Sequence, residues 1–279
     1  MRRLVHETTS PYHRIFVQED DEVRTLRFER NPQSSMLLTD AFETDIRYPG
    51  YFHIALALKP DPKRVLVLGL GGGSVVKRMW RDYPEARVDA VELDTAVVEI
   101  AREYFAVPDD ERIRVFTGDG REFLESATDL YDLIVVDAFD DDEVPHRLVT
   151  EEFMRLARDC LTEGGVLTYN LIGRVRGDLS RPFRSFNRTI RNVFASVWVF
   201  PIRPEVFITL TEDRNIVVFA TDTKVTTDEL LARIADRVGG RVTVPGFERF
   251  GDDLHREPIR GGDVSVLTDG PGRHRHRRR

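Results

Sequence analysis

The chain has 279 residues and a formal net charge of −7, with 41% hydrophobic and 32% charged residues. This composition suits one large α/β domain with a small accessory region, and it excludes bulk electrostatic binding of nucleic acid by the body of the protein. The single cysteine, Cys160, excludes an intramolecular disulfide and a cysteine-based metal cluster. No apolar run is long enough to span a membrane, and the first residues lead into no apolar stretch. We therefore expect a cytoplasmic protein without a secretory signal.

Residues 1–60 predict a small N-terminal β region followed by a helix. Arg14–Gln18 and Val23–Phe28 alternate apolar and polar side chains, which is typical of half-buried strands in an antiparallel sheet. A helix is expected over Tyr51–Leu58, and the prolines of Pro60–Pro62 end it.

Residues 61–240 repeat a strand followed by a helix, which predicts a doubly wound, mostly parallel, Rossmann-like sheet of seven strands. The expected strands are Val65–Leu68, Val88–Glu92, Ile113–Thr117, Leu133–Val136, Val166–Asn170, Ala195–Phe200 and Asn215–Ala220. The last two suit an antiparallel closing hairpin. Residues 241–279 are expected to form a polar C-terminal segment with a disordered basic tail at 273–279, which is the one part of the chain that could attract nucleic acid or an acidic partner.

The most informative stretch is the glycine turn of Gly69–Ser74, which follows the first strand of this repeat. The next strand ends in Glu92 and Asp94, at the distance where a carboxylate can hold ribose hydroxyls. The glycines are bunched and no Lys-Ser or Lys-Thr follows them, so neither a dinucleotide fingerprint nor a P-loop is present. This pattern predicts a site for a nucleoside without phosphates, such as S-adenosylmethionine and its relatives. We predict that the residues that bind this cofactor include Gly69, Gly71, Gly73, Glu92 and Asp94.

Acidic residues also follow the third and fourth strands, as Asp119 and as Asp137 with Asp140. The carboxyl ends of parallel strands meet at one edge of a sheet, so these acids are expected to share a site with Glu92. For Asp119 alone, a helix N-cap is the alternative interpretation.

This ordered set of motifs resembles the spermidine synthase (polyamine aminopropyltransferase) family, and more closely its spermidine-synthase-like branch with a methyltransferase-type Rossmann fold. The resemblance covers residues 30–220 and rests on Gly69–Ser74, Val91–Asp94, Gly118–Gly120, Asp137–Asp140, Thr150–Phe153 and Gly164–Gly165.

The resemblance implies roles for the donor-binding residues. Glu92 would hold the ribose hydroxyls, and Asp119 with Gly120 would recognise the adenine. Gln33 would line the aliphatic arm of the donor, which in this family is decarboxylated S-adenosylmethionine.

For catalysis, the resemblance implies that Asp137 accepts the proton of the attacking amine and that Asp140 is the second acid. The segment 137–153 would be a gate loop that closes over the substrate. His53 and Asp142 are further candidates for substrate contact, with a core or cap role as the alternative for His53 and a solvated loop surface as the alternative for Asp142.

Two positions depart from the family pattern. Gly72 stands where the synthases carry an acid that binds the terminal amine of the donor, and Phe52–Ile54 stands where they carry a Tyr-His-Glu-like segment. An acid at position 72 would repel the carboxylate of intact S-adenosylmethionine, so Gly72 would admit that donor.

The sequence therefore predicts a transferase that moves an alkyl (aminopropyl) group from an S-adenosyl sulfonium donor to an amine or other small nucleophile, such as a polyamine, without a metal ion. Two alternatives are a methyltransferase that uses intact S-adenosylmethionine and a nucleoside-binding protein without turnover. The resemblance also implies a homodimer, for which the sequence itself carries no signal.

Overall fold

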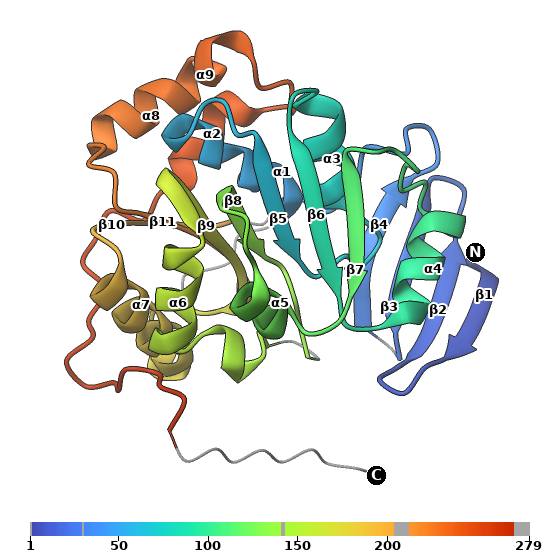
Figure 1. Ribbon diagram of the computed structural model, residues 1–279, viewed down its shortest axis with the longest axis horizontal. Helices are drawn as coiled ribbons and strands as arrows, with labels where there is room; N and C mark the ends of the chain where they lie inside the picture. Colours follow the sequence, from blue (N-terminus) through green and yellow to red (C-terminus); the bar gives the residue numbers. More distant parts are fainter. Residues whose placement is uncertain (1, 30, 141–142, 204–211, 271–279) are drawn as a thin grey trace.

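A seven-stranded sheet forms the centre of the fold (Figure 1). The computed structural model describes residues 2–29, 31–140, 143–203 and 212–270. The strand order is β10–β11–β9–β8–β5–β6–β7, and β11 alone runs opposite to its neighbours. The strands are β5 (Arg64–Leu68), β6 (Arg87–Glu92), β7 (Ile113–Thr117), β8 (Tyr131–Val136), β9 (Leu161–Gly173), β10 (Ser196–Pro201) and β11 (Arg214–Thr221). The doubly wound sheet and its closing hairpin are thus confirmed.

Helices cover both faces of this sheet. They are α1 (Tyr48–Tyr51), α2 (Ala55–Leu58), α3 (Ser74–Asp82), α4 (Thr95–Tyr104), α5 (Gly120–Ser126), α6 (Glu151–Asp159), α7 (Arg181–Val193), α8 (Thr227–Ala235) and α9 (Arg237–Gly240). Alternate residues of β5 enter different cores: Val65 and Val67 pack with α2, α3 and α8, whereas Leu66 and Leu68 pack with α6 and α7. Because both faces are covered, the strand reads as a continuous apolar run. No helix of the described residues could cross a membrane.

The expected N-terminal β region is a four-stranded antiparallel sheet in the order β1–β2–β3–β4. Its strands are β1 (Arg3–Thr9), β2 (Arg14–Glu19), β3 (Val23–Phe28) and β4 (Asn31–Leu37). Ile15, Val17 and Leu26 are fully buried against Ile100 and Phe105 at helix α4. This packing fixes the small sheet beside the carboxyl ends of β5 and β6 (Figure 1).

The helix expected over 51–58 begins earlier, at Tyr48, and is divided by a 3-10 turn at Phe52–Ile54 into α1 and α2. Pro49 lies in the first turn, where its fixed φ favours helix initiation and its missing N–H costs no hydrogen bond. The earlier start places Tyr48 at the functional cavity described below.

The segment after residue 240 differs from the expectation of a polar region. Val242, Val244, Phe247 and Phe250 are buried in the same core as α8, and the Phe250 ring stacks on Tyr51 with centroids 4.0 Å apart. Residues 241–270 therefore complete the α/β body. The basic tail at 273–279 lies outside the described residues.

Candidate active site

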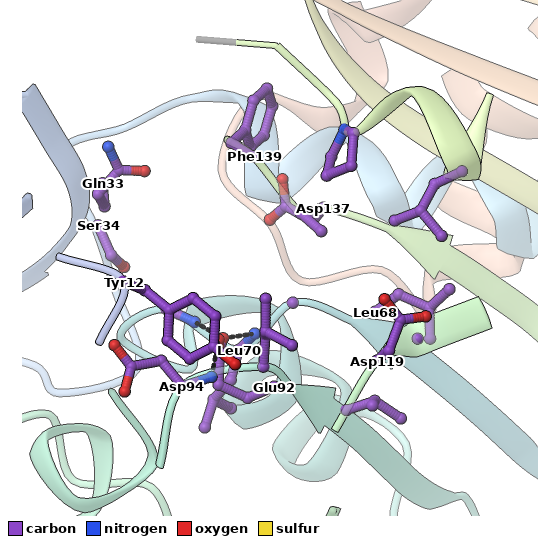
Figure 2. Close-up of a pocket in the computed structure, with 18 of the residues that line it drawn as sticks. Tyr12, Gln33, Ser34, Leu68, Leu70, Glu92, Asp94, Asp119, Asp137 and Phe139 are labelled. Carbon is purple, nitrogen blue, oxygen red and sulfur yellow. Dashed lines mark hydrogen bonds between the residues drawn. The ribbon is translucent and has the colours of Figure 1, made fainter. Parts of the chain in front are cut away.

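A cavity lies where the carboxyl ends of β5, β6, β7 and β8 face the N-terminal sheet. The chain passes from β5 to α3 and later enters β8 on the other side of β5, which makes this edge the switch point where ligands of doubly wound sheets bind. The predicted residues that line the cavity are Gln33, Gly69, Gly71, Glu92, Asp94, Asp119, Gly120 and Asp137. Figure 2 shows Asp137 and Phe139 across the cavity from Glu92 and Asp94.

The glycine turn brings β5 and β8 together at this point. Gly69 has a φ of +98°, and an added Cβ would lie 2.2 Å from the backbone oxygen of Asp137. Only glycine tolerates both the left-handed conformation and this close approach. Gly73 does not line the cavity. It caps α3 with a φ of +72°, and its missing Cβ leaves room for Val107, so it shapes the turn.

Glu92 is held by the backbone around the glycine turn. Its carboxylate accepts the N–H of Leu70 at 2.9 Å, of Gly71 at 3.4 Å and of Asp94 at 3.1 Å. Burial raises the pKa of Glu92, and the three backbone donors oppose that rise. A carboxylate fixed in this way keeps oxygen lone pairs for the cavity, where they can accept hydrogen bonds from ribose hydroxyls.

Asp94 has both carboxylate oxygens engaged by protein groups. One oxygen accepts the N–H of Ala96 at 3.0 Å and caps α4, and the other accepts the Ser10 hydroxyl at 2.5 Å. Asp94 lines the cavity. Because both of its carboxylate oxygens already have protein donors, its side chain serves to connect the end of β6 to the turn at Ser10.

Asp119 caps α5 and also forms an ion pair. One oxygen accepts the N–H groups of Arg121 and Glu122, and the other lies 2.7 Å from the Arg147 guanidinium. Arg147 also lines the cavity, and sequence reasoning missed it because nothing in its local pattern indicates an ion pair with a residue after β7. An adenine amino group would have to share or displace this contact.

Asp137 is half-buried beside two hydrogen-bond donors. The Tyr48 hydroxyl donates to one carboxylate oxygen at 3.1 Å, and the Asn170 amide donates to the other at 3.0 Å. Asn170 is oriented in turn by Asn215, whose amide donates to it at 3.1 Å. Burial raises the pKa of Asp137 from 3.8 to about 6, and the bonds from Asn170 and Tyr48 oppose the rise.

Sequence reasoning missed Tyr48 and Asn170. Asn170 had a local signal, because a buried amide in the apolar run of Val166–Leu171 needs a polar partner. Tyr48 had none. It lies 89 residues before Asp137, and only the early start of α1 brings its hydroxyl to the carboxylate.

Two predicted residues, Asp140 and His53, lie away from the cavity. Asp140 is exposed and does not line the cavity; its backbone N–H donates to the oxygen of Glu143 at 2.8 Å, whereas the neighbouring Ala138 and Phe139 do face the cavity. Asp142 lies outside the described residues. His53 is fully buried away from the cavity, and its Nε2 lies 3.1 Å from the Asp82 carboxylate. The expected substrate contact of His53 is therefore not found, and the alternative core role describes it.

The two departures from the family pattern also have structural consequences. A Cβ at Gly72 would lie 2.7 Å from the Ser34 hydroxyl and 3.0 Å from the Phe105 ring, so the space of an acidic side chain is already filled. Ser34 and Ser74 line this end of the cavity with their hydroxyls 3.3 Å apart. Ile54 is fully buried in the core.

Within the described ranges, no cluster of histidine, cysteine or acidic residues suits a metal ion.

Residues 51–204 match the spermine/spermidine synthase domain. The polyamine aminopropyltransferase of Vibrio vulnificus (strain CMCP6) is 33% identical over 211 residues, which cover 72% of this chain and 69% of that protein.

Two solved structures have the same fold. A probable spermidine synthase from Corynebacterium glutamicum ATCC 13032 superposes with a TM-score of 0.74 at 19% identity, covering 96% of this chain and 97% of that one. A spermidine synthase in complex with the transition-state analogue AdoDATO superposes with a TM-score of 0.68 at 22% identity, covering 89% and 88%.

Proposed function

The chain belongs to the spermine/spermidine synthase family, and we propose that it transfers an aminopropyl group from an S-adenosyl sulfonium donor to an amine, with Asp137 as the proton acceptor. Membership of this family supports a transferase of polyamine synthesis. Asp137 carries the proposal through its position, because its half-buried carboxylate lies at the switch point across one cavity from Glu92.

The donor is proposed to lie along the sheet edge. Glu92 at the end of β6 would accept the ribose hydroxyls, and Asp119 after β7 would accept the adenine amino group. With the base on the β7 side, the 5′ substituent points toward β5 and β8, where Asp137 follows β8 (Figure 2). Gln33 and Ser34 lie at one end of this space and Asp119 lies at the other.

The acceptor amine would bind beside Asp137. An aliphatic amine has a pKa of about 10 and arrives protonated, so it has no free lone pair. Asp137 would take a proton from the nitrogen and orient its lone pair toward the carbon next to sulfur. The C–N bond forms as the C–S bond breaks, and the electron pair of that bond stays on sulfur as a neutral thioether. The remaining assistance is positioning, through the hydrogen bonds that hold Asp137.

The test is Asp137→Asn with decarboxylated S-adenosylmethionine and putrescine or spermidine as substrates. Loss of the proton acceptor should lower the release of methylthioadenosine at least about 100-fold. Binding of methylthioadenosine, measured by calorimetry, should change little, because Glu92 and its backbone donors remain. Asp109→Asn removes an exposed carboxylate outside the cavity and serves as the control. Turnover that survives in Asp137→Asn would refute the role of this residue.

A second candidate function is methyl transfer from intact S-adenosylmethionine. The end of the cavity beside Gly72 favours it, because the Ser34 and Ser74 hydroxyls line this end and Gly72 brings no carboxylate there. A neutral surface does not repel the donor's carboxylate. The products separate the two functions, because aminopropyl transfer releases methylthioadenosine and methyl transfer releases S-adenosylhomocysteine. Binding of nucleosides without either product would leave a non-catalytic binding protein.

A further inference from the structure

The turn between β1 and β2 forms one wall of the functional cavity. This wall is separate from the glycine turn and from the acids at the strand ends. Tyr12 and His13 of this turn line the cavity together with Phe28 of β3. Figure 2 shows the Tyr12 ring on the same side of the cavity as Glu92 and Asp94. We propose that Tyr12 is a nucleoside-contacting residue whose ring covers the adenosyl group held by Glu92, and that Ser10 and Asp94 are positioning residues that hold the turn in place. This inference rests on the proposed donor site.

The turn is organised around the Ser10 hydroxyl. Its oxygen accepts the backbone N–H groups of Tyr12 at 3.1 Å and His13 at 3.0 Å, and the hydroxyl donates to Asp94 at 2.5 Å. Asp94 in turn donates its own N–H to Glu92, which accepts the N–H groups of the glycine turn. A continuous set of hydrogen bonds therefore connects the position of Tyr12 to the carboxylate proposed to bind ribose.

Neighbouring contacts give the wall a fixed base. The His13 ring stacks on Phe28 with centroids 4.2 Å apart and planes inclined by 8°. The short sheet is itself anchored on α4 by Ile15 and Leu26, and by Arg24, which donates to the backbone oxygen of Tyr104 at 2.6 Å. The end of the hairpin is therefore held against the end of β6 from two sides.

The Tyr12 side chain nevertheless remains about half exposed to solvent. It is 51% exposed, and Leu93, between Glu92 and Asp94, is 46% exposed and lines the same cavity. Two large apolar side chains left open at a cavity mouth gain from burial by a ligand with an apolar face. The faces of adenine and ribose have this chemistry, and an aromatic ring stacks on a base whatever its hydrogen-bonding edge.

Calorimetric titration of the full chain with methylthioadenosine tests the proposal, because this probe has the nucleoside but no amine or carboxylate at its end. Tyr12→Ala should weaken binding roughly tenfold, and Tyr12→Phe should bind like the unaltered protein. The matched control is Leu4→Ala, which removes an equally exposed apolar side chain (51%) from β1, outside the cavity. This control should leave the affinity unchanged.

Ser10→Ala tests the positioning role. It should weaken binding several-fold in the unaltered chain and have no further effect in the Tyr12→Ala background, a coupling that a general loss of stability would not produce. Ser196→Ala, which removes a comparable hydroxyl-to-backbone bond from β10, is the control.

The outcomes separate this inference from the proposed function. If the unaltered protein binds methylthioadenosine and Tyr12→Ala binds equally well, the inference is wrong while the donor site stands. If Ser10→Ala weakens binding equally with and without Tyr12, the positioning role is wrong. If the unaltered protein does not bind methylthioadenosine, the donor site falls and the inference falls with it.

Discussion

Desolvation of the ionised Asp137 carboxylate should lower the free energy of unfolding, and Asp137→Asn should remove this destabilisation. One pKa unit is worth about 1.36 kcal/mol, so a rise from 3.8 to about 6 means that ionising Asp137 costs the folded state about 3 kcal/mol more than it costs the unfolded chain. Because the folded-state pKa is the higher one, the cost is absent below pH 3.8, develops as the pH rises from 3.8 to about 6, and is complete above that range.

The asparagine variant does not titrate and escapes this cost. It also has one acceptor oxygen where the carboxylate has two, so its NH2 group cannot accept from whichever of Tyr48 and Asn170 it faces, and this costs about 1 kcal/mol at every pH. The stability of Asp137→Asn relative to the unaltered protein should therefore be greater at pH 8 than at pH 5, by about 1.4 kcal/mol from the two pKa values.

Urea unfolding of both proteins at pH 5 and pH 8, with the slopes compared, measures this difference. Asp109→Asn, an exposed loop carboxylate outside the cavity, shows how much of the change any charge removal produces. If the stability difference between Asp137→Asn and the unaltered protein were the same at both pH values, Asp137 would not have a raised pKa. Desolvation would then not bring the pKa of this carboxyl close to neutral pH.

Further predictions concern the surroundings of Asp137. Tyr48→Phe removes a hydrogen bond that lowers the pKa of Asp137, so the low-pH limb of the turnover profile should move upward by as much as about one pH unit. Asn170→Ala should move it further in the same direction, because its bond lowers that pKa more; a midpoint that stays in place in both variants would contradict the assignment. Gly69→Ala should cost about 2 kcal/mol or more, because its φ is +98° and the new Cβ would meet the Asp137 backbone. Urea unfolding measures this cost against Gly262→Ala, where an added Cβ meets no atom within 4 Å and the loss should be close to zero.

Local sequence patterns are enough to predict the central sheet and the edge at which the cavity lies. Apolar runs such as Val65–Leu68 and Leu133–Val136 predict buried parallel strands, and the alternation with helices brings their carboxyl ends together. For that reason Glu92, Asp119 and Asp137 could be assigned to one cavity before the structure was known. These are local patterns combined with a topological rule, and neither depends on side-chain packing.

The hydrogen-bond partners of these acids come from distant parts of the chain and follow only from the folded structure. Asp94 is engaged by Ser10, 84 residues earlier in the chain, and Asp137 receives the hydroxyl of Tyr48 from 89 residues away. Such partners depend on the docking of the N-terminal sheet and on the early start of α1, which no local pattern encodes.

Long-range packing also explains two of the differences between the expectations and the structure. His53 has a polar side chain on a helix close to the site in sequence, yet the helix turns it toward Asp82 in the interior. Val242 and Phe250 stand in a segment without helical or strand periodicity, and they become core residues because α8 and α1 leave apolar surface that they cover. The positions of the strand ends follow from local sequence patterns. The burial of a side chain and its hydrogen-bond partners depend instead on which distant surfaces of the chain pack together.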